Sequence, residues 1–70
     1  MVNEIKAARV RLGFTQKNVA EQMKMNVFSY QKKESGAVRF TDSQKIQLAK
    51  ILQLSNSEMN DFLFNGELPI

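Results

Sequence analysis

Residues 15–36, TQKNVAEQMKMNVFSYQKKESG, decide the fold of this chain. Thr15 precedes an apolar stripe, which is the pattern of an N-cap followed by an amphipathic helix over about 16–23. Asn26 is a second capping residue, and it follows the first helix so closely that the chain must turn sharply there. A second helix is then expected to end before Gly36, because glycine is common just after a helix C-terminus. The stretch therefore predicts two short helices joined by a tight turn.

The flanking segments add three more helices. Apolar residues at spacings of three and four, followed by Gly13, indicate a helix over residues 3–12. A polar capping cluster precedes a helix expected over about 42–52, and Ser55 opens a Ser-x-x-Glu capping box for a short fifth helix. No segment alternates with a period of two residues, so no sheet is expected. The predicted fold class is all-α, with five helices.

One side of these helices supplies enough apolar surface for a core. Ala20 is small, and this is expected because two helices that cross steeply after a tight turn must approach closely. The other residues predicted to be buried are Ile5, Ala8, Val19, Met23, Tyr30, Leu48 and Leu52. Burying a large apolar side chain contributes about 1.5–3 kcal/mol, so this cluster can support a small domain.

Length and composition exclude several functions. A chain of 70 residues holds one domain, expected at 1–64, followed by a tail at 65–70. It contains no Cys and no His, which removes disulfides, thiolate chemistry and the common zinc ligand sets. The carboxylates are scattered and the three glycines lie far apart, so neither an active site nor a phosphate-binding loop is expected. We expect a non-enzyme with no catalytic residues, no metal, no cofactor and no small-molecule ligand.

Charge and hydropathy favour a nucleic-acid partner and a cytoplasmic location. The net charge is +3, with five cations against two anions in residues 15–39 and three anions but no cation in residues 55–70. A basic central segment suits a polyanion. The apolar runs are far shorter than the roughly 20 residues of a membrane span, and the N-terminus lacks an apolar signal-peptide region. We therefore expect a cytoplasmic protein with no membrane partner.

The stretch at 15–36 resembles the helix-turn-helix of the phage repressor and Cro family of XRE-like transcriptional regulators. The matching features are Thr15-Gln16, Val19-Ala20, Met23 and Met25 around the turn, Asn26 as a cap, and Glu34 with Gly36 at the close. Ile5, Ala8 and Arg9 fit the family's first helix, and Leu48-Ala49-Lys50 fit its fourth. The resemblance implies a five-helix lambda-repressor-like DNA-binding domain that acts as a sequence-specific regulator of phage, prophage or bacterial type.

The resemblance also implies roles for individual residues. The recognition helix, at about 27–34, would lie in the major groove of double-stranded DNA. Base contacts are expected from Val27, Phe28, Ser29, Gln31 and Lys32. Gln31 or Lys32 would form hydrogen bonds to purine edges, and Val27 and Phe28 would pack against thymine methyls. Phosphate contacts are expected from Gln16, Lys17, Arg39, Thr41 and Ser43. Arg9 and Glu34 match positions that form a partly buried structural ion pair in similar proteins.

Three departures from the family pattern leave a second function open. Lys24 stands where glycine is usual and is expected to adopt a positive φ, and Lys33 replaces an aliphatic residue, so its stem should lie along the core edge. Val27 and Phe28 replace polar residues at the start of the recognition helix. Exposed apolar side chains there are typical of a protein interface. The alternative is an antirepressor or modulator of the same fold that binds a partner repressor through Val27, Phe28 and nearby residues and alters its DNA binding.

Apolar residues near the C-terminus also predict self-association. Ile51, Phe62, Phe64, Leu68 and Ile70 exceed what one small core can bury. Related proteins bind two DNA half-sites about one helical turn apart through two-fold symmetry. A homodimer is therefore expected, with this C-terminal region as its interface.

Overall fold

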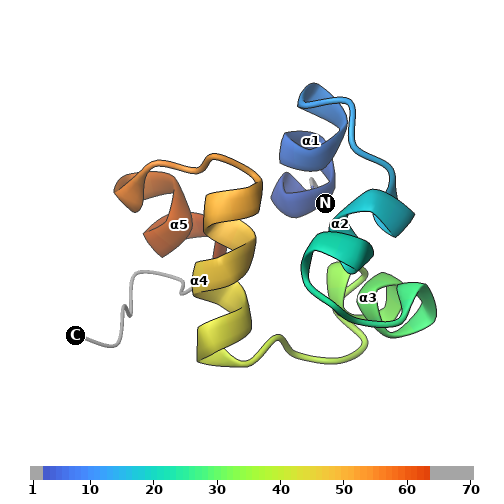
Figure 1. Cartoon of the computed structure of the whole chain (residues 1–70). Helices are drawn as coiled ribbons and strands as arrows, with labels where there is room; N and C mark the ends of the chain where they lie inside the picture. Colours follow the sequence, from blue (N-terminus) through green and yellow to red (C-terminus); the bar gives the residue numbers. More distant parts are fainter. Residues whose placement is uncertain (1–2, 64–70) are drawn as a thin grey trace.

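The computed structural model describes residues 3–63, and the five helices expected from the sequence are present in it (Figure 1). They are α1 (Glu4–Arg11), α2 (Gln16–Gln22), α3 (Val27–Glu34), α4 (Asp42–Ile51) and α5 (Asn56–Leu63). The ends agree with the sequence prediction to within one or two residues, and residues 3–63 contain no strand. The all-α fold class is confirmed.

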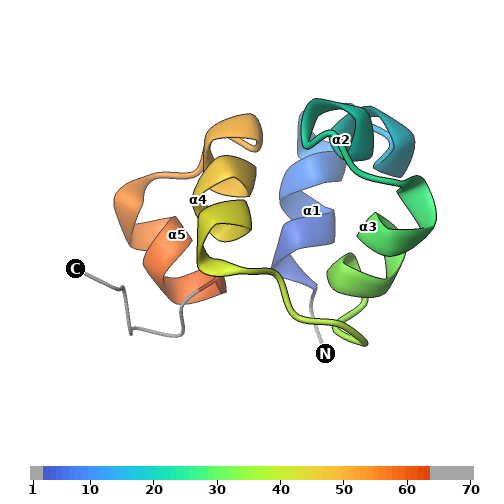
Figure 2. The ribbon, with the colours of Figure 1, turned by 60° about the horizontal axis from the view of Figure 1, so that its bottom comes forward.

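The helices form two packed pairs with α1 between them. α2 packs on α3 and α4 packs on α5. Figure 1 shows these pairs on opposite sides of the molecule, and Figure 2 shows α1 lying between them. Within the described residues, no helix is long and apolar enough to span a membrane.

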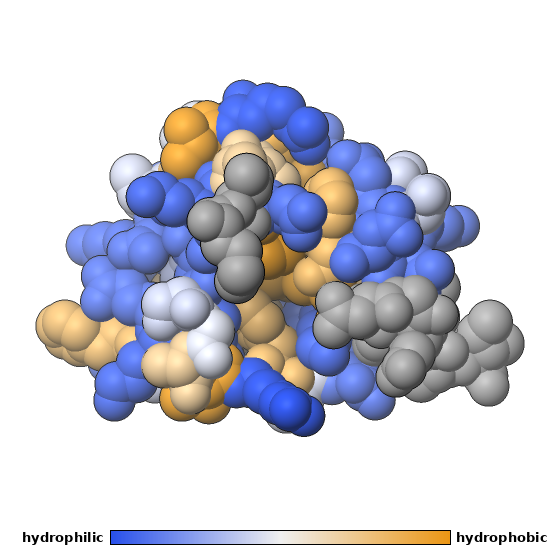
Figure 3. Space-filling model, turned by 180° about the vertical axis from the view of Figure 1, so that it is seen from behind, coloured by the Kyte–Doolittle hydropathy of each residue, from blue (hydrophilic) through white to orange (hydrophobic). Residues whose placement is uncertain are grey.

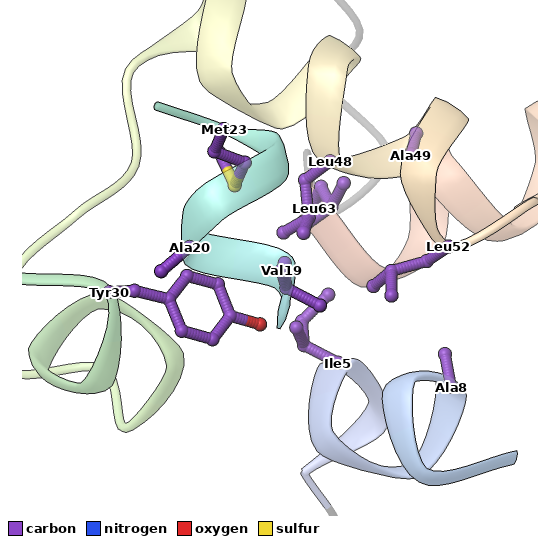
Figure 4. Close-up of a cluster of buried hydrophobic side chains, with 10 residues drawn as sticks. All are labelled: Ile5, Ala8, Val19, Ala20, Met23, Tyr30, Leu48, Ala49, Leu52 and Leu63. Carbon is purple, nitrogen blue, oxygen red and sulfur yellow. The ribbon is translucent and has the colours of Figure 1, made fainter. Parts of the chain in front are cut away.

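The core contains every residue that the sequence placed there (Figure 4). Its buried side chains are Ile5, Ala8, Val19, Ala20, Met23, Tyr30, Leu48, Ala49, Leu52 and Leu63. All five helices contribute to this cluster, so each helix is held through its apolar side by the rest of the chain. One face of α3 is therefore fixed against the core through Tyr30.

The core takes up part of Ile51 and Phe62, which the sequence assigned to a C-terminal interface, while the interface and the homodimer stay predictions. Ile51 and Phe62 are half-buried and pack against the core, because α5 folds back on α4 and turns these side chains inward. Phe64, Leu68 and Ile70 lie outside the described residues. The large apolar side chains that are exposed within residues 3–63 are Val10, Phe28, Val38 and Ile46. On the face seen in Figure 3, apolar surface appears as separate patches between hydrophilic side chains.

Side chains cap the helix N-termini, as the sequence predicts for α2 to α5 but not for Asn3 before α1. The side chains of Asn3, Thr15, Asn26 and Thr41 each accept a backbone N–H of the helix that follows. Ser55 and Glu58 form the predicted capping box, in which the Ser55 hydroxyl accepts the Glu58 N–H at 3.1 Å and the Glu58 carboxylate accepts the Ser55 N–H at 3.0 Å. These bonds satisfy N–H groups that have no partner inside their own helix.

Four helices are followed by a residue with positive φ, at Gly13, Lys24, Gly36 and Gln53. At the end of α2, the Lys24 N–H donates to the Glu21 carbonyl and the Met25 N–H donates to the Ala20 carbonyl, both at 3.0 Å. This bond pattern requires a residue with positive φ at its centre. The positive φ predicted for Lys24 is confirmed, at 56°. The turn directs the chain from α2 into α3.

Candidate functional site

The outward face of α3 is the candidate site, and residues 23–26 set its orientation. The Asn26 side chain caps α3 by accepting the Phe28 N–H at 2.8 Å. Ala20 of α2 is 1% exposed, and Met25 packs against the core from the turn itself. Because both sides of the turn are anchored, α3 presents one defined face to solvent.

Four of the five residues predicted to contact bases are exposed on α3. They are Phe28, Ser29, Gln31 and Lys32, and Phe28 is 66% exposed. Val27 is different, because it is half-buried and packs against the core. It precedes Tyr30 by three residues, and residues three apart lie on the same side of a helix. The prediction of two exposed apolar residues is therefore wrong for Val27 and confirmed for Phe28.

A shallow depression brings α2 and α3 residues together. It has a volume of about 410 Å³ and is lined by Gln16, Phe28, Gln31, Lys32 and Ser35. The sequence assigned the first four of these to base or phosphate contacts, but it gave no role to Ser35. The depression thus joins an aromatic side chain, two amides, a cation and a hydroxyl on one surface.

A buried ion pair lies behind this surface. Arg9 Nε donates to Glu34 Oε2 at 2.9 Å and Arg9 Nη2 donates to Glu34 Oε1 at 3.2 Å. The two side chains are 9% and 3% exposed, and Arg9 Nη1 also donates to the Phe14 carbonyl at 2.8 Å. The pair predicted from the resemblance thus ties α1 to the end of α3.

The pair keeps Glu34 ionised. Burial raises the pKa of this carboxyl, but the hydrogen bonds from Arg9 and Gln16, together with the nearby Tyr30 hydroxyl, outweigh burial, so the pKa lies below its ordinary value. Tyr30 is fully buried beside the ion pair. Burial is the main cause that raises the pKa of its hydroxyl, and the nearby Glu34 carboxylate raises it further. At neutral pH the site therefore has a charged carboxylate and a neutral phenol beneath it.

Gln16 connects the buried pair to the surface. Its Nε2 donates to Glu34 Oε1 at 3.2 Å, and its Oε1 accepts from Gln31 Nε2 at 3.0 Å. Hydrogen bonds thus run from Arg9 through Glu34 and Gln16 to exposed Gln31 on α3. This arrangement links the start of α2 to the middle of α3.

The other predicted phosphate contacts lie apart from the depression. Lys17 is exposed at the start of α2, whereas Arg39 and Ser43 are exposed in and after the connection that leads to α4. The Thr41 hydroxyl caps α4 by accepting the Gln44 N–H at 3.1 Å. None of these four residues lines the depression on α3.

Lys33 behaves as expected, through a partner that the sequence did not indicate. The side chain is half-buried, and its Nζ donates to Gln44 Oε1 at 2.7 Å. The same oxygen accepts the Thr41 N–H at 3.0 Å, so Gln44 fastens the end of α3 to the start of α4. The capping pattern Thr-x-x-Gln at 41–44 is a signal that could have indicated this residue.

Two further positioning residues were missed. Asn18 completes a capping box with Thr15, in which each side chain accepts the other residue's N–H. Asn3 caps α1 and also donates from Nδ2 to the Glu34 carbonyl at 2.8 Å. The spacing of Thr15 and Asn18 indicates the first role, but nothing local in the sequence indicates the contact between Asn3 and Glu34.

Comparisons with known proteins add no relative. No protein-family model matches the chain, and no match was found among the curated proteins or the solved structures. The evidence for function is therefore the arrangement of the residues described above.

Proposed function

We propose that this protein is a sequence-specific DNA-binding transcriptional regulator with a lambda-repressor-like helix-turn-helix fold. In this proposal α3 lies in the major groove, which is about 12 Å wide and admits an α-helix. The observation that carries the proposal is the exposed face of α3, which presents Phe28, Gln31 and Lys32 beside Gln16 of α2. Amide and ammonium groups can bond base edges, and an aromatic ring can contact thymine methyls.

The charge distribution supports a DNA partner. Glu34 is paired with Arg9 inside the protein, so its charge is largely neutralised near α3. The exposed charged residues from 15 to 39 are Lys17, Glu21, Lys24, Lys32 and Arg39. Cations therefore outnumber anions on the surface of this segment, and cations that neutralise phosphates release bound counterions from DNA. The proposed phosphate contacts that fix register are Gln16, Lys17, Arg39, Thr41 and Ser43.

Phe28 favours a second candidate function. An aromatic ring that is 66% exposed at the first turn of α3 is also the kind of anchor that protein interfaces use. In this alternative the protein binds a partner repressor through Phe28 and its neighbours and changes the repressor's DNA binding. Because Val27 faces the core, Phe28 would supply the main apolar anchor.

Fluorescence anisotropy tests the two functions against each other. Labelled duplexes that cover the control region beside the protein's own gene are titrated at low and at physiological salt, with a Phe28→Ala variant in parallel. DNA binding predicts saturable binding to a particular segment, with an affinity that falls steeply with salt. The variant should then lose discrimination between segments.

The alternative predicts a different outcome. Binding to DNA would be absent or equal for all segments, and the protein would instead bind the neighbouring repressor with an affinity that Phe28→Ala weakens. Ile46→Ala is the matched control, because Ile46 is another exposed large apolar residue but lies on α4. It should leave both kinds of binding unchanged.

A further inference from the structure

We infer that the Gln31 side chain recognises adenine in the major groove. The buried Glu34 carboxylate sets this preference, because it orients the Gln16 amide, which in turn fixes which edge of the Gln31 amide faces outward. The inference rests on the proposed DNA-binding function and specifies the base that one residue recognises. It follows from which atoms in the hydrogen-bonded chain can donate and which can only accept.

The chain begins at a group that cannot donate. The Glu34 carboxylate is ionised, so both of its oxygens are acceptors, and Arg9 already donates to each of them. The Nε2 atom of Gln16 lies 3.2 Å from Glu34 Oε1. The opposite orientation of the Gln16 amide would bring two acceptor oxygens together. The NH₂ group of Gln16 must therefore face Glu34, and its Oε1 must face away.

The orientation of Gln31 follows from that of Gln16. Gln31 Nε2 donates to Gln16 Oε1 at 3.0 Å, and a rotated Gln31 amide would again oppose two oxygens. No other hydrogen bond to the Gln31 side chain is present within residues 3–63. Its Oε1 and its second N–H therefore remain available at the surface of an exposed residue. The buried charge fixes the direction of both amides.

An acceptor next to a donor matches adenine in the major groove. Adenine presents the N6 amino group as a donor and N7 as an acceptor, and a glutamine amide bonds both. Guanine presents two acceptors, O6 and N7, so the outward Gln31 oxygen would face an acceptor there. Phe28 lines the same depression and offers apolar surface to the thymine methyl of an A·T pair.

Two variants test the inference on the best site selected from random duplexes. Relative affinities are measured by competition after each A·T pair of the site is changed in turn to G·C. The native protein should prefer adenine over guanine at one position of the selected site by about 5- to 150-fold. Gln31→Ala should abolish the preference at that position alone. A duplex with 7-deazaadenine there should weaken native binding but not the binding of Gln31→Ala.

Gln16→Leu isolates the positioning role. It leaves Gln31 in place but releases the amide, which can then rotate and donate to guanine. The ratio of adenine to guanine affinity at that position should fall several-fold. Any lost phosphate contact of Gln16 would weaken binding to all sequences equally and would leave the ratio unchanged. Gln47→Ala on α4 is the control, and it should leave the ratio as in the native protein.

The outcomes separate this inference from the proposed function. Specific DNA binding with an adenine preference that neither Gln31→Ala nor Gln16→Leu changes would overturn the inference but not the DNA-binding function. Absence of specific DNA binding by the native protein would overturn both. Circular dichroism of each variant confirms that the helices are retained, so a changed ratio is not due to unfolding.

Discussion

Replacing Arg9 by methionine tests how far the buried ion pair supports the fold. The substitution keeps an apolar stem but removes three hydrogen bonds, two to Glu34 and one to the Phe14 carbonyl. It leaves a carboxylate that is 3% exposed without its cation. Removing one partner of such a pair destabilises a protein by about 3–5 kcal/mol.

This loss is large relative to the stability of so short a chain. At roughly 0.05–0.15 kcal/mol per residue, 70 residues give a free energy of unfolding of roughly 3.5–10 kcal/mol. Urea titration followed by circular dichroism measures the difference, and sucrose in the buffer keeps the variant folded at the start. Lys6→Met is the control, because Lys6 is an exposed cation on the same helix and its loss should change stability by less than about 0.5 kcal/mol.

A second substitution isolates the charge. If the destabilisation comes from the unpaired carboxylate, then adding Glu34→Leu to Arg9→Met should recover much of the lost stability, since apolar replacement of a whole buried pair is often neutral. A loss below about 1 kcal/mol for Arg9→Met alone would contradict a stabilising role of the ion pair. So would a double variant that is no more stable than Arg9→Met.

Three further predictions concern stability. Because the pKa of Glu34 in the folded chain lies below 4.5, the ion pair should stabilise the fold above about pH 4.5. This stabilisation should be lost as the pH falls through the pKa of Glu34 in the folded chain. Urea midpoints measured from pH 6 to 2 should therefore fall less for Glu34→Gln than for the native protein. Lys24→Gly should stabilise the protein by up to about 1 kcal/mol. A left-handed residue other than glycine is strained by about 1–2 kcal/mol, and glycine offsets about 0.5–1 kcal/mol of this relief through its larger loss of backbone entropy. A lower urea midpoint for the variant would contradict this prediction. Leu48→Ala should destabilise the protein by about 2–5 kcal/mol in the same assay, because Leu48 is fully buried. Ile46→Ala, at an exposed position of the same helix, should change the stability far less. Equal losses in the two variants would contradict the assigned core.

The helices and the core were predictable because their causes are local. Asn26 and the Ser55 capping box mark helix starts by side-chain chemistry, and apolar spacing marks which face is buried. The left-handed turn at Lys24 was predictable only through the resemblance, because lysine itself gives no signal for positive φ. The equivalent turn at Gln53 had neither a glycine nor a resemblance to indicate it.

The site was less predictable because its contacts join residues far apart in sequence. Gln16 and Gln31 are 15 positions apart, and only the angle between α2 and α3 brings their amides within 3.0 Å. Val27 was assigned to the surface by its place at the start of α3, but its spacing from Tyr30 turns it towards the core. A periodicity count over eight residues cannot resolve which side of so short a helix is buried.

The salt dependence of DNA binding shows whether this face of α2 and α3 contacts phosphates. The logarithm of the association constant is measured against the logarithm of salt concentration for the native protein, for Lys17→Ala and for Lys50→Ala. Lys17 is a proposed phosphate contact at the start of α2, whereas Lys50 is an exposed cation at the end of α4, outside the proposed interface. We expect the slope to become shallower by about 1 for Lys17→Ala and to stay unchanged for Lys50→Ala. Equal slopes for all three proteins, or an equal change in both variants, would contradict the claim that this face of α2 and α3 binds DNA.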